Sequence, residues 1–297
     1  MAKIKKRWYQ KAGTYRKVTQ GLVFLAMTAV YLRHIVFLEG NVEEFCPFGG
    51  LETLFSYLTT GTYLKHINPL NLGLFVAIMG ITLAFRGGFC GWICPIGTAQ
   101  DLLRTAGKKI GGFSFLKGVN TRYKIWVKGN NSKLVKVDFW ARKFKYLFLI
   151  IIIAATWIKA DLVIRDFDLI VALMKILAFE LSVGLIILVL IVILSFFMDR
   201  PFCKYFCVLG ATINLVGKLS PLRVVRNDKS CINCNLCNKS CPMQLEIAKV
   251  PRVESIDCNH CFRCLDACPV ADTLDLAYFP KGIYTSTKKP AAGKLEV

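Results

Sequence analysis

The chain has few histidines and few acidic residues. Its 297 residues include three histidines, and 19 acidic residues stand against 39 basic ones. His34 and His66 fall near one predicted membrane face and His260 lies inside a cysteine-rich run, so no matched pair offers the two axial ligands of a haem. The sequence also lacks a phosphate-binding glycine loop and a nucleophile paired with a base. We therefore expect no haem and no catalytic acid, base or nucleophile.

Cysteine, by contrast, is abundant, and eight of the 13 cysteines form two copies of one spacing. Each copy is Cys-x2-Cys-x2-Cys-x3-Cys-Pro, which is typical of two 4Fe–4S clusters that exchange their fourth ligand. The spacing predicts these ligand sets: Cys231, Cys234, Cys237 and Cys268 for the first cluster, and Cys258, Cys261, Cys264 and Cys241 for the second. Paired zinc sites are the alternative, but zinc sites use two Cys pairs rather than a third cysteine and a trailing Cys-Pro.

A second cysteine motif, Phe-Cys-x3-Cys-x2-Gly, also occurs twice. The copies contain Cys90 and Cys94, then Cys203 and Cys207, and each follows an apolar block. Cysteines four apart share one helix face, so the copies together offer four thiolates to a third 4Fe–4S cluster. Two alternatives remain: the cysteines are buried small side chains, or each pair holds part of a separate cluster with ligands from a partner.

Composition and charge indicate an integral membrane protein. Hydrophobic residues make up 55% of the chain, mean hydropathy is +0.48 and formal net charge is +20. Apolar blocks at residues 21–38, 70–85, 146–158 and 181–198 approach the ~20 residues that span a bilayer. We predict a mainly α membrane protein, with four transmembrane helices forming two related hairpins and a small α+β dicluster ferredoxin-like cytoplasmic domain.

Charged residues outside these blocks predict the orientation. Residues 1–17 hold seven basic residues and no acidic one, and residues 86–145 hold thirteen against two, whereas residues 39–68 hold four acidic residues and one lysine. Basic residues favour the cytoplasmic side, so both termini and the dicluster domain are expected inside, in the cytoplasmic (inner) membrane. The positive charge favours lipid over nucleic acid as a partner. We expect charged residues at loop ends to face water or lipid headgroups.

The predicted organisation has four parts. Residues 1–17 form a basic cytoplasmic N-terminus, and residues 18–220 form the four-helix membrane domain with both Cys-x3-Cys motifs. Residues 221–280 form the dicluster domain, and residues 281–297 form a C-terminal tail.

Cys46 stands apart from the other cysteines, on the predicted outer side. Its Cys-Pro-x-Gly sequence resembles the one that begins at Cys94. It is either a packed thiol at the start of the helix predicted over residues 51–58, with Pro47 as the first helical residue, or a redox contact or ligand for a partner on the outer face.

The chain resembles the NapH/MauN-type membrane-bound ferredoxins, a family related to the membrane modules of NosR and CcoG. The resemblance rests on three segments: Phe-Cys-Gly-Trp-Ile-Cys-Pro-Ile-Gly at residues 89–97, its second copy and the dicluster segment. The resemblance covers about residues 20–279, although Val208 replaces the proline of the second copy. It implies electron passage between quinone and redox enzymes, or copper reduction as in CcoG-type proteins.

The leading prediction is an electron-transfer subunit of a membrane oxidoreductase complex rather than a self-contained enzyme. Three 4Fe–4S clusters would relay electrons between a cytoplasmic redox partner and the membrane, where quinone or a partner's cofactor would exchange them. The alternative is a stand-alone copper reductase or metallocentre-assembly factor, for which Cys46, His34 and His66 are the only candidate metal ligands gathered on one side.

Overall fold

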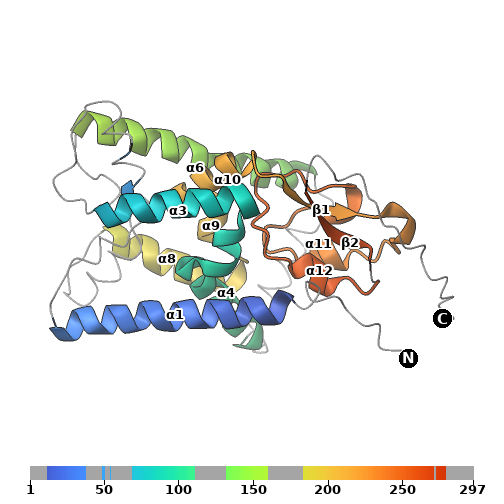
Figure 1. The fold of residues 1–297 in the computed structure, drawn as a ribbon, viewed down its shortest axis with the longest axis horizontal. Coiled ribbons are helices and arrows are strands. Elements are labelled where there is room, and N and C mark those ends of the chain that lie inside the picture. The colour runs from blue at the N-terminus through green and yellow to red at the C-terminus, as the bar shows by residue number, and fades with distance from the viewer. Residues whose placement is uncertain are drawn as a thin grey trace.

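The computed structural model describes residues 12–37, 49–50, 54, 69–110, 132–159, 183–270 and 272–278. Long helices run side by side through one end of the molecule, and the segment that contains the two cysteine runs lies at the other end (Figure 1).

Among the described residues, the helical part contains five helices of 15 to 28 residues and several short ones. In chain order they are α1 (Ala12–Phe37), α3 (Pro69–Phe85), the π-helix η3 (Phe89–Ile93), α4 (Pro95–Ile110), α6 (Ser132–Lys159), α8 (Val183–Phe197), α9 (Pro201–Tyr205) and α10 (Val208–Gly217). Helices α4 and α10 connect the others by packing: α4 packs against α8 and α1, and α10 packs against α3 and α6. Leu149 and Ile152 of α6 pack with Val208 and Ala211 of α10 in a buried apolar cluster.

The prediction of four transmembrane helices arranged as two hairpins was wrong. Within the ranges that the structure describes, no helix has both the length and the apolar composition needed to cross a membrane. Helices α3 and α8 have 17 and 15 residues, short of the ~20 that span a bilayer. Helices α1 and α6 have 26 and 28 residues, but charged side chains interrupt their apolar sequence.

The two Cys-x3-Cys motifs occupy equivalent places in the fold. Each follows a long helix, passes through a five-residue helical turn and leads into another helix: α3, η3 and α4 in the first copy, and α8, α9 and α10 in the second. The expectation that each cysteine pair lies on one continuous helix was wrong. Cys90 and Cys203 lie inside the short turns, whereas Cys94 ends η3 and Cys207 caps α10.

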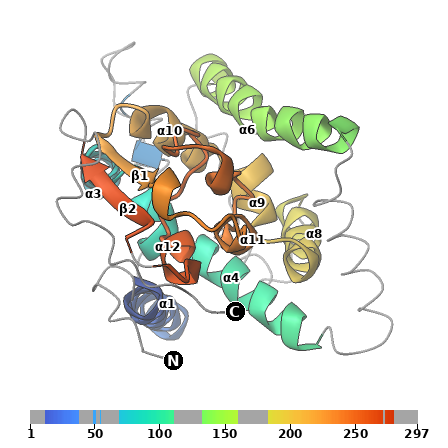
Figure 2. The same cartoon turned by 90° about the vertical axis from the view of Figure 1, so that its right-hand side faces the viewer.

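The cysteine-rich segment forms a small α+β unit. Strand β1 (Leu222–Arg226) pairs antiparallel with β2 (Leu274–Tyr278), and Val224 is opposite Leu276. The short helices η5 (Asp228–Ser230), α11 (Leu236–Ser240), η6 (Ile247–Lys249) and α12 (Arg263–Ala267) lie between the strands. Figure 2 shows α11 and α12 beside one another, and α12 also contacts α1 and β2. The unit therefore packs directly onto the helical part.

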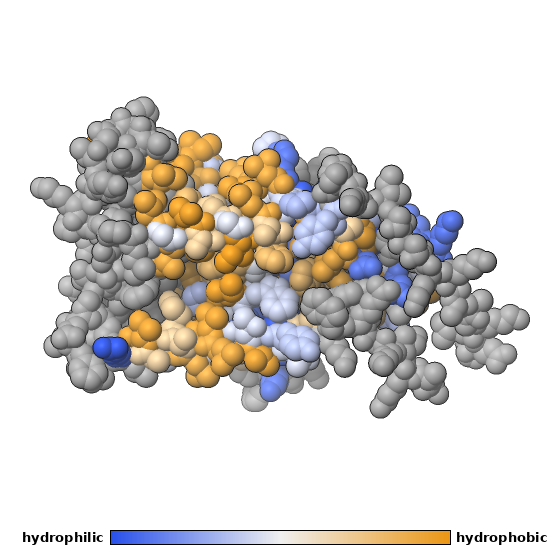
Figure 3. Space-filling view, viewed as in Figure 1, coloured by the Kyte–Doolittle hydropathy of each residue, from blue (hydrophilic) through white to orange (hydrophobic). Residues whose placement is uncertain are grey.

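Apolar side chains cover much of the helical surface (Figure 3). Leu25 on α1 is 67% exposed and Ile186 on α8 is 68% exposed, and α3 and α6 present similar residues. Exposed apolar patches of this kind mark contact with a partner or with lipid.

Candidate functional site

The structure brings together the four cysteines predicted for the first cluster. Cys231, Cys234, Cys237 and Cys268 line one small cavity, so the fourth cysteine of the second run does reach the first three of the first run. Cys234 is exposed and Cys231 is partly exposed, which puts this cavity at the surface. Burial raises the pKa of the buried Cys237 thiol and of the half-buried Cys268 thiol. A donor set of four thiols around one cavity fits a cubane cluster.

Each run folds into a loop, and the two loops have the same backbone conformation. Asn233 and His260, which precede the second cysteine of each run, have φ of 54° and 44°. Asn235 and Phe262, which follow it, have φ of 56° and 55°. Non-glycine residues rarely adopt this left-handed conformation, and in the second run the His260 N–H donates to the Cys258 sulfur. The loop of the second run therefore stabilises negative charge on the Cys258 sulfur.

In the second set of cysteines, Cys261 and Cys264 are buried, and Cys241 and Cys258 are half-buried. The Cys264 thiol lies within electrostatic range of Cys258, Cys261 and Cys241, the four residues that the spacing predicts. Burial raises the pKa of Cys258 to about 12 and that of Cys241 to about 11. Backbone N–H groups of Leu245 and Met243 donate to the Cys241 sulfur.

The four cysteines of the Cys-x3-Cys motifs also converge. Burial, followed by the neighbouring thiols of Cys94, Cys207 and Cys203, raises the pKa of Cys90 far above its usual value. The side chain of Gln100 donates to Cys203 Sγ at 3.3 Å, and the Gly210 N–H donates to Cys207 Sγ at 3.2 Å. Four converging sulfurs, of which those of Cys203 and Cys207 accept N–H hydrogen bonds, fit a third cubane cluster.

Across the residues that the structure describes, no three His, Cys, Asp or Glu side chains converge tightly enough to hold a single metal ion. The wider separation of the thiols is compatible with the predicted cubanes, because each thiolate of a cubane binds its own iron. The assignment of all twelve described cysteines as iron ligands stays a prediction.

The turn that holds the third set of cysteines touches the loop that holds the second. Trp92 Nε1 donates to the His260 carbonyl oxygen at 3.0 Å, and His260 Nδ1 lies 3.0 Å from the Phe85 carbonyl oxygen. A Cβ atom on Gly91 would overlap the Asn259 carbonyl oxygen. Glycine is thus required where η3 meets the backbone of the second cysteine run.

Charged side chains add to the same interface. Arg86 is 1% exposed and donates to the carbonyl oxygens of Val253, Glu254 and Ser255 at 3.1, 2.7 and 2.7 Å. Lys145 is fully buried, and its Nζ lies 2.5 Å from Asp257 Oδ1. The polar contacts hold the cysteine-rich unit in a defined position on the helices.

The expectation that charged residues at loop ends face water or headgroups was wrong for the residues around the cysteines. Arg86 and Arg200, which precede the two Cys-x3-Cys motifs, are buried and have φ of 56° and 52°. Lys204, between Cys203 and Cys207, is also fully buried and donates to Gln244 at 2.5 Å. The arginine that precedes each motif was the sequence signal for these buried charges.

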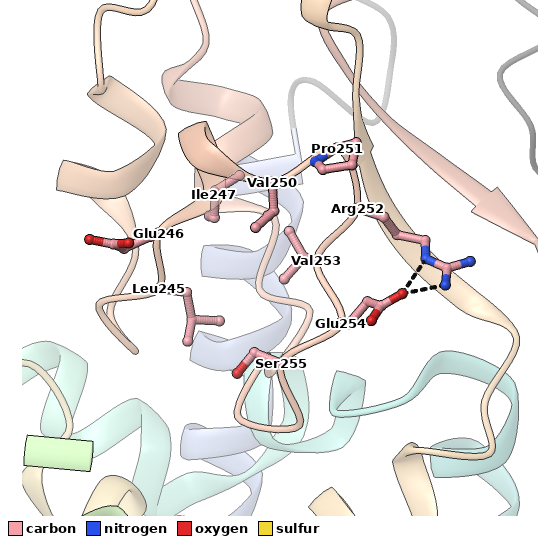
Figure 4. A pocket seen from close by; sticks show the side chains of 9 residues that line it. All are labelled: Leu245, Glu246, Ile247, Val250, Pro251, Arg252, Val253, Glu254 and Ser255. Atoms are coloured by element: carbon pink, nitrogen blue, oxygen red, sulfur yellow. Dashed lines mark hydrogen bonds and ion pairs between the residues drawn. The ribbon is translucent and has the colours of Figure 1, made fainter. Parts of the chain in front are cut away.

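A groove runs along the segment between the two cysteine runs, and it is lined by residues 245–247 and 250–255 (Figure 4). Its ends adjoin the second set, since the Leu245 N–H donates to Cys241 and the Cys258 N–H donates to the Ser255 carbonyl oxygen at 3.1 Å. Arg252 pairs with Glu254 at its rim.

Cys46 and His66 lie outside the described residues, and His34 falls within α1. The predictions that concern an outer-face contact or metal site therefore have no structural counterpart here.

Comparisons with known proteins agree with the cysteine geometry. A family model described as a 4Fe-4S binding domain matches residues 67–112 and 182–226, and one described as a 4Fe-4S dicluster domain matches residues 223–270. No solved structure matches the chain.

Three relatives illustrate the similarity. YccM of Escherichia coli, described as an electron transport protein, is 31% identical over 96% of this chain and 79% of its own length. The ferredoxin-type protein NapH of Haemophilus influenzae is 24% identical, over 66% of this chain and 62% of its own. The methylamine utilization ferredoxin-type protein MauN of Paracoccus denitrificans is 25% identical, over 59% and 53% respectively.

Proposed function

This chain belongs to the 4Fe–4S ferredoxin-type electron transport proteins, and on that premise we propose that it relays electrons through three 4Fe–4S clusters between a cytoplasmic redox partner and quinone or a partner's cofactor at the membrane. The resemblance to NapH and MauN is thereby confirmed. Iron–sulfur binding and electron transport are shown for the family, whereas the number of clusters, the quinone and the partners belong to the proposal.

The observation that carries the proposal is the backbone contact between the turn at Gly91 and the second cysteine run at Asn259 and Cys261. It places the third set of cysteines directly beside the second. The second set in turn shares its sequence runs with the first, because Cys241 and Cys268 cross over. Three adjacent sets are what a relay requires and more than a single anchoring site would need.

Exposure favours an order along the relay. The first set includes the exposed Cys234, whereas every cysteine of the second and third sets is buried or half-buried. A soluble partner would therefore exchange electrons at the first set. The third set, among the helices, would serve the partner at the membrane.

The chain's own residues bind and tune the cofactors. Bound at these sulfurs, 4Fe–4S clusters would supply one-electron carriers. Backbone N–H groups and Gln100 stabilise negative charge on sulfur in the second and third sets. No acid, base or nucleophile is needed for this chemistry.

We further propose that the exposed apolar surface of α1, α3, α6 and α8 associates with the cytoplasmic membrane, with the cysteine-rich unit facing the cytoplasm. The support is the group of exposed side chains that includes Leu25, Val76, Ile150 and Ile186.

A reconstituted assay tests the proposed function. The purified chain, placed in liposomes with a water-soluble quinone analogue, should pass electrons from dithionite-reduced flavodoxin to the quinone. Replacing Cys90 with Ser should stop quinone reduction yet leave the first set reducible by flavodoxin. If the Cys90→Ser chain reduces quinone at the wild-type rate, the third set is not part of the route.

A further inference from the structure

Asp101 on α4 is the meeting point of three arginines from separate parts of the chain. Arg200, just before α9, binds its carboxylate twice: Nε donates to Oδ1 at 3.1 Å and Nη2 donates to Oδ2 at 2.7 Å. Arg263 on α12 lies 2.9 Å from the same carboxylate, and Arg16 on α1 lies 3.7 Å from it. Three cations around one anion leave an excess of positive charge. We call these four residues the arginine node.

The arginine node lies between the second and third sets of cysteines. Arg200 is fully buried, and its Nη1 donates to the Cys90 carbonyl oxygen at 2.8 Å. Its charge acts on Cys203 of the third set and Cys261 of the second. Arg16, which is 4% exposed, also acts on Cys261.

The charges of the Arg200–Asp101 pair are permanent at neutral pH. Burial alone would lower the pKa of Arg200, but Asp101 raises it above its ordinary value. Burial alone would raise the pKa of Asp101, but Arg200, Arg263 and Arg16 lower it to about 2. The pair therefore presents a fixed field to the cysteines rather than one that changes with pH.

We propose that Arg200, held in place by Asp101, is a positioning residue that raises the reduction potential of the cluster at the third set of cysteines. Reduction adds one negative charge to that site, and a buried cation beside Cys90 and Cys203 stabilises the added charge, since water screens it little there. Arg200 itself is neither oxidised nor reduced. The inference rests on the proposed function, because it requires a cluster at Cys90, Cys94, Cys203 and Cys207.

Redox titration followed by electron paramagnetic resonance tests this role on the intact chain. The signal of the third set is first identified as the one that Cys90→Ser removes. Arg200→Gln should then make that site at least about tenfold harder to reduce at a given potential, about 59 mV for a one-electron couple. Asp101→Asn should shift the potential in the opposite sense, because it removes an anion from the same place. Arg200→Lys, which keeps the charge, should stay near the wild-type value.

Lys108→Gln is the matched control. Lys108 lies on the same helix as Asp101 and is 53% exposed, so its replacement removes one positive charge at the surface and should leave the potential unchanged. Opposite shifts in the Arg200→Gln and Asp101→Asn chains support the inference, and shifts of the same sign or none overturn it.

Two further results keep the inference open to refutation. If Arg200→Gln prevents folding, Asp101→Asn decides, since an unchanged or lowered potential in that chain contradicts the electrostatic role. If the wild-type chain has no signal that Cys90→Ser removes, the third cluster of the proposed function is absent, and this inference falls with it. A signal that Cys90→Ser removes, but whose potential changes in neither the Arg200→Gln nor the Asp101→Asn chain, overturns the inference alone.

Discussion

Replacing Gly91 with Ala should separate the second and third sets of cysteines. The new Cβ would overlap the Asn259 carbonyl oxygen and lie 3.2 Å from Cys261 Cα and 3.3 Å from its N. All three atoms belong to the backbone, so no flexible side chain can turn aside. Overpacking typically costs about 1–3 kcal/mol, and we expect about 3 kcal/mol here because a whole loop must move.

Gly80→Ala provides the control for Gly91→Ala. Gly80 lies in α3 with nothing within 4 Å of the position its Cβ would take, so alanine should stabilise the helix by roughly 0.5–1 kcal/mol. At about 2–4 °C per kcal/mol, anaerobic thermal unfolding should show a fall of roughly 6–12 °C for Gly91→Ala and a small rise for Gly80→Ala. Equal unfolding temperatures in the two variants would refute the close backbone contact.

Three other changes probe the same interface and the cysteine environments. Lys145→Met leaves the Asp257 carboxylate poorly paired and should lower the free energy of unfolding by about 3 kcal/mol. Lys143→Met, at an exposed site, should change it by less than about 0.5 kcal/mol. Denaturant titration of the two variants compares these values. Gln100→Leu removes the donor to Cys203 and should lower the reduction potential of the third set, measured by redox titration; an unchanged value would show that this bond is unimportant. Burial raises the pKa of Cys258 to about 12, so its thiol is protonated in the apoprotein at neutral pH and iron must displace the proton. Iron uptake, followed by absorbance, should therefore be weaker at pH 6 than at pH 8. Uptake that does not depend on pH would contradict this.

The cysteine sets were the most predictable part of the molecule. Metal-ligand spacing is local, and a run such as Cys231 to Cys241 carries its loop geometry within eleven residues. The cross-over that brings Cys268 to the first set follows from the repeat of that spacing. The third set could also be predicted, because the same motif follows two apolar blocks.

The lengths of the helices and the burial of charged side chains could not be predicted from local sequence patterns. Apolar composition identified helical segments, but the length of α8 and the charges within α6 depend on where each helix begins and ends. Hydropathy also treats Arg200 and Asp101 as surface residues, because their burial depends on each other across 99 positions of sequence. The fit of Gly91 against Asn259 is likewise a long-range contact that no local pattern contains.

The number of clusters per chain is the most direct test of three adjacent sets. Anaerobically purified, fully loaded protein should contain about twelve irons per chain, and Mössbauer spectroscopy should show them all in cubane clusters. The Cys90→Ser and Cys203→Ser chains should each lose about four irons and keep the spectra of the other two sets. A wild-type chain with about eight irons, from which Cys90→Ser removes none, would contradict the account.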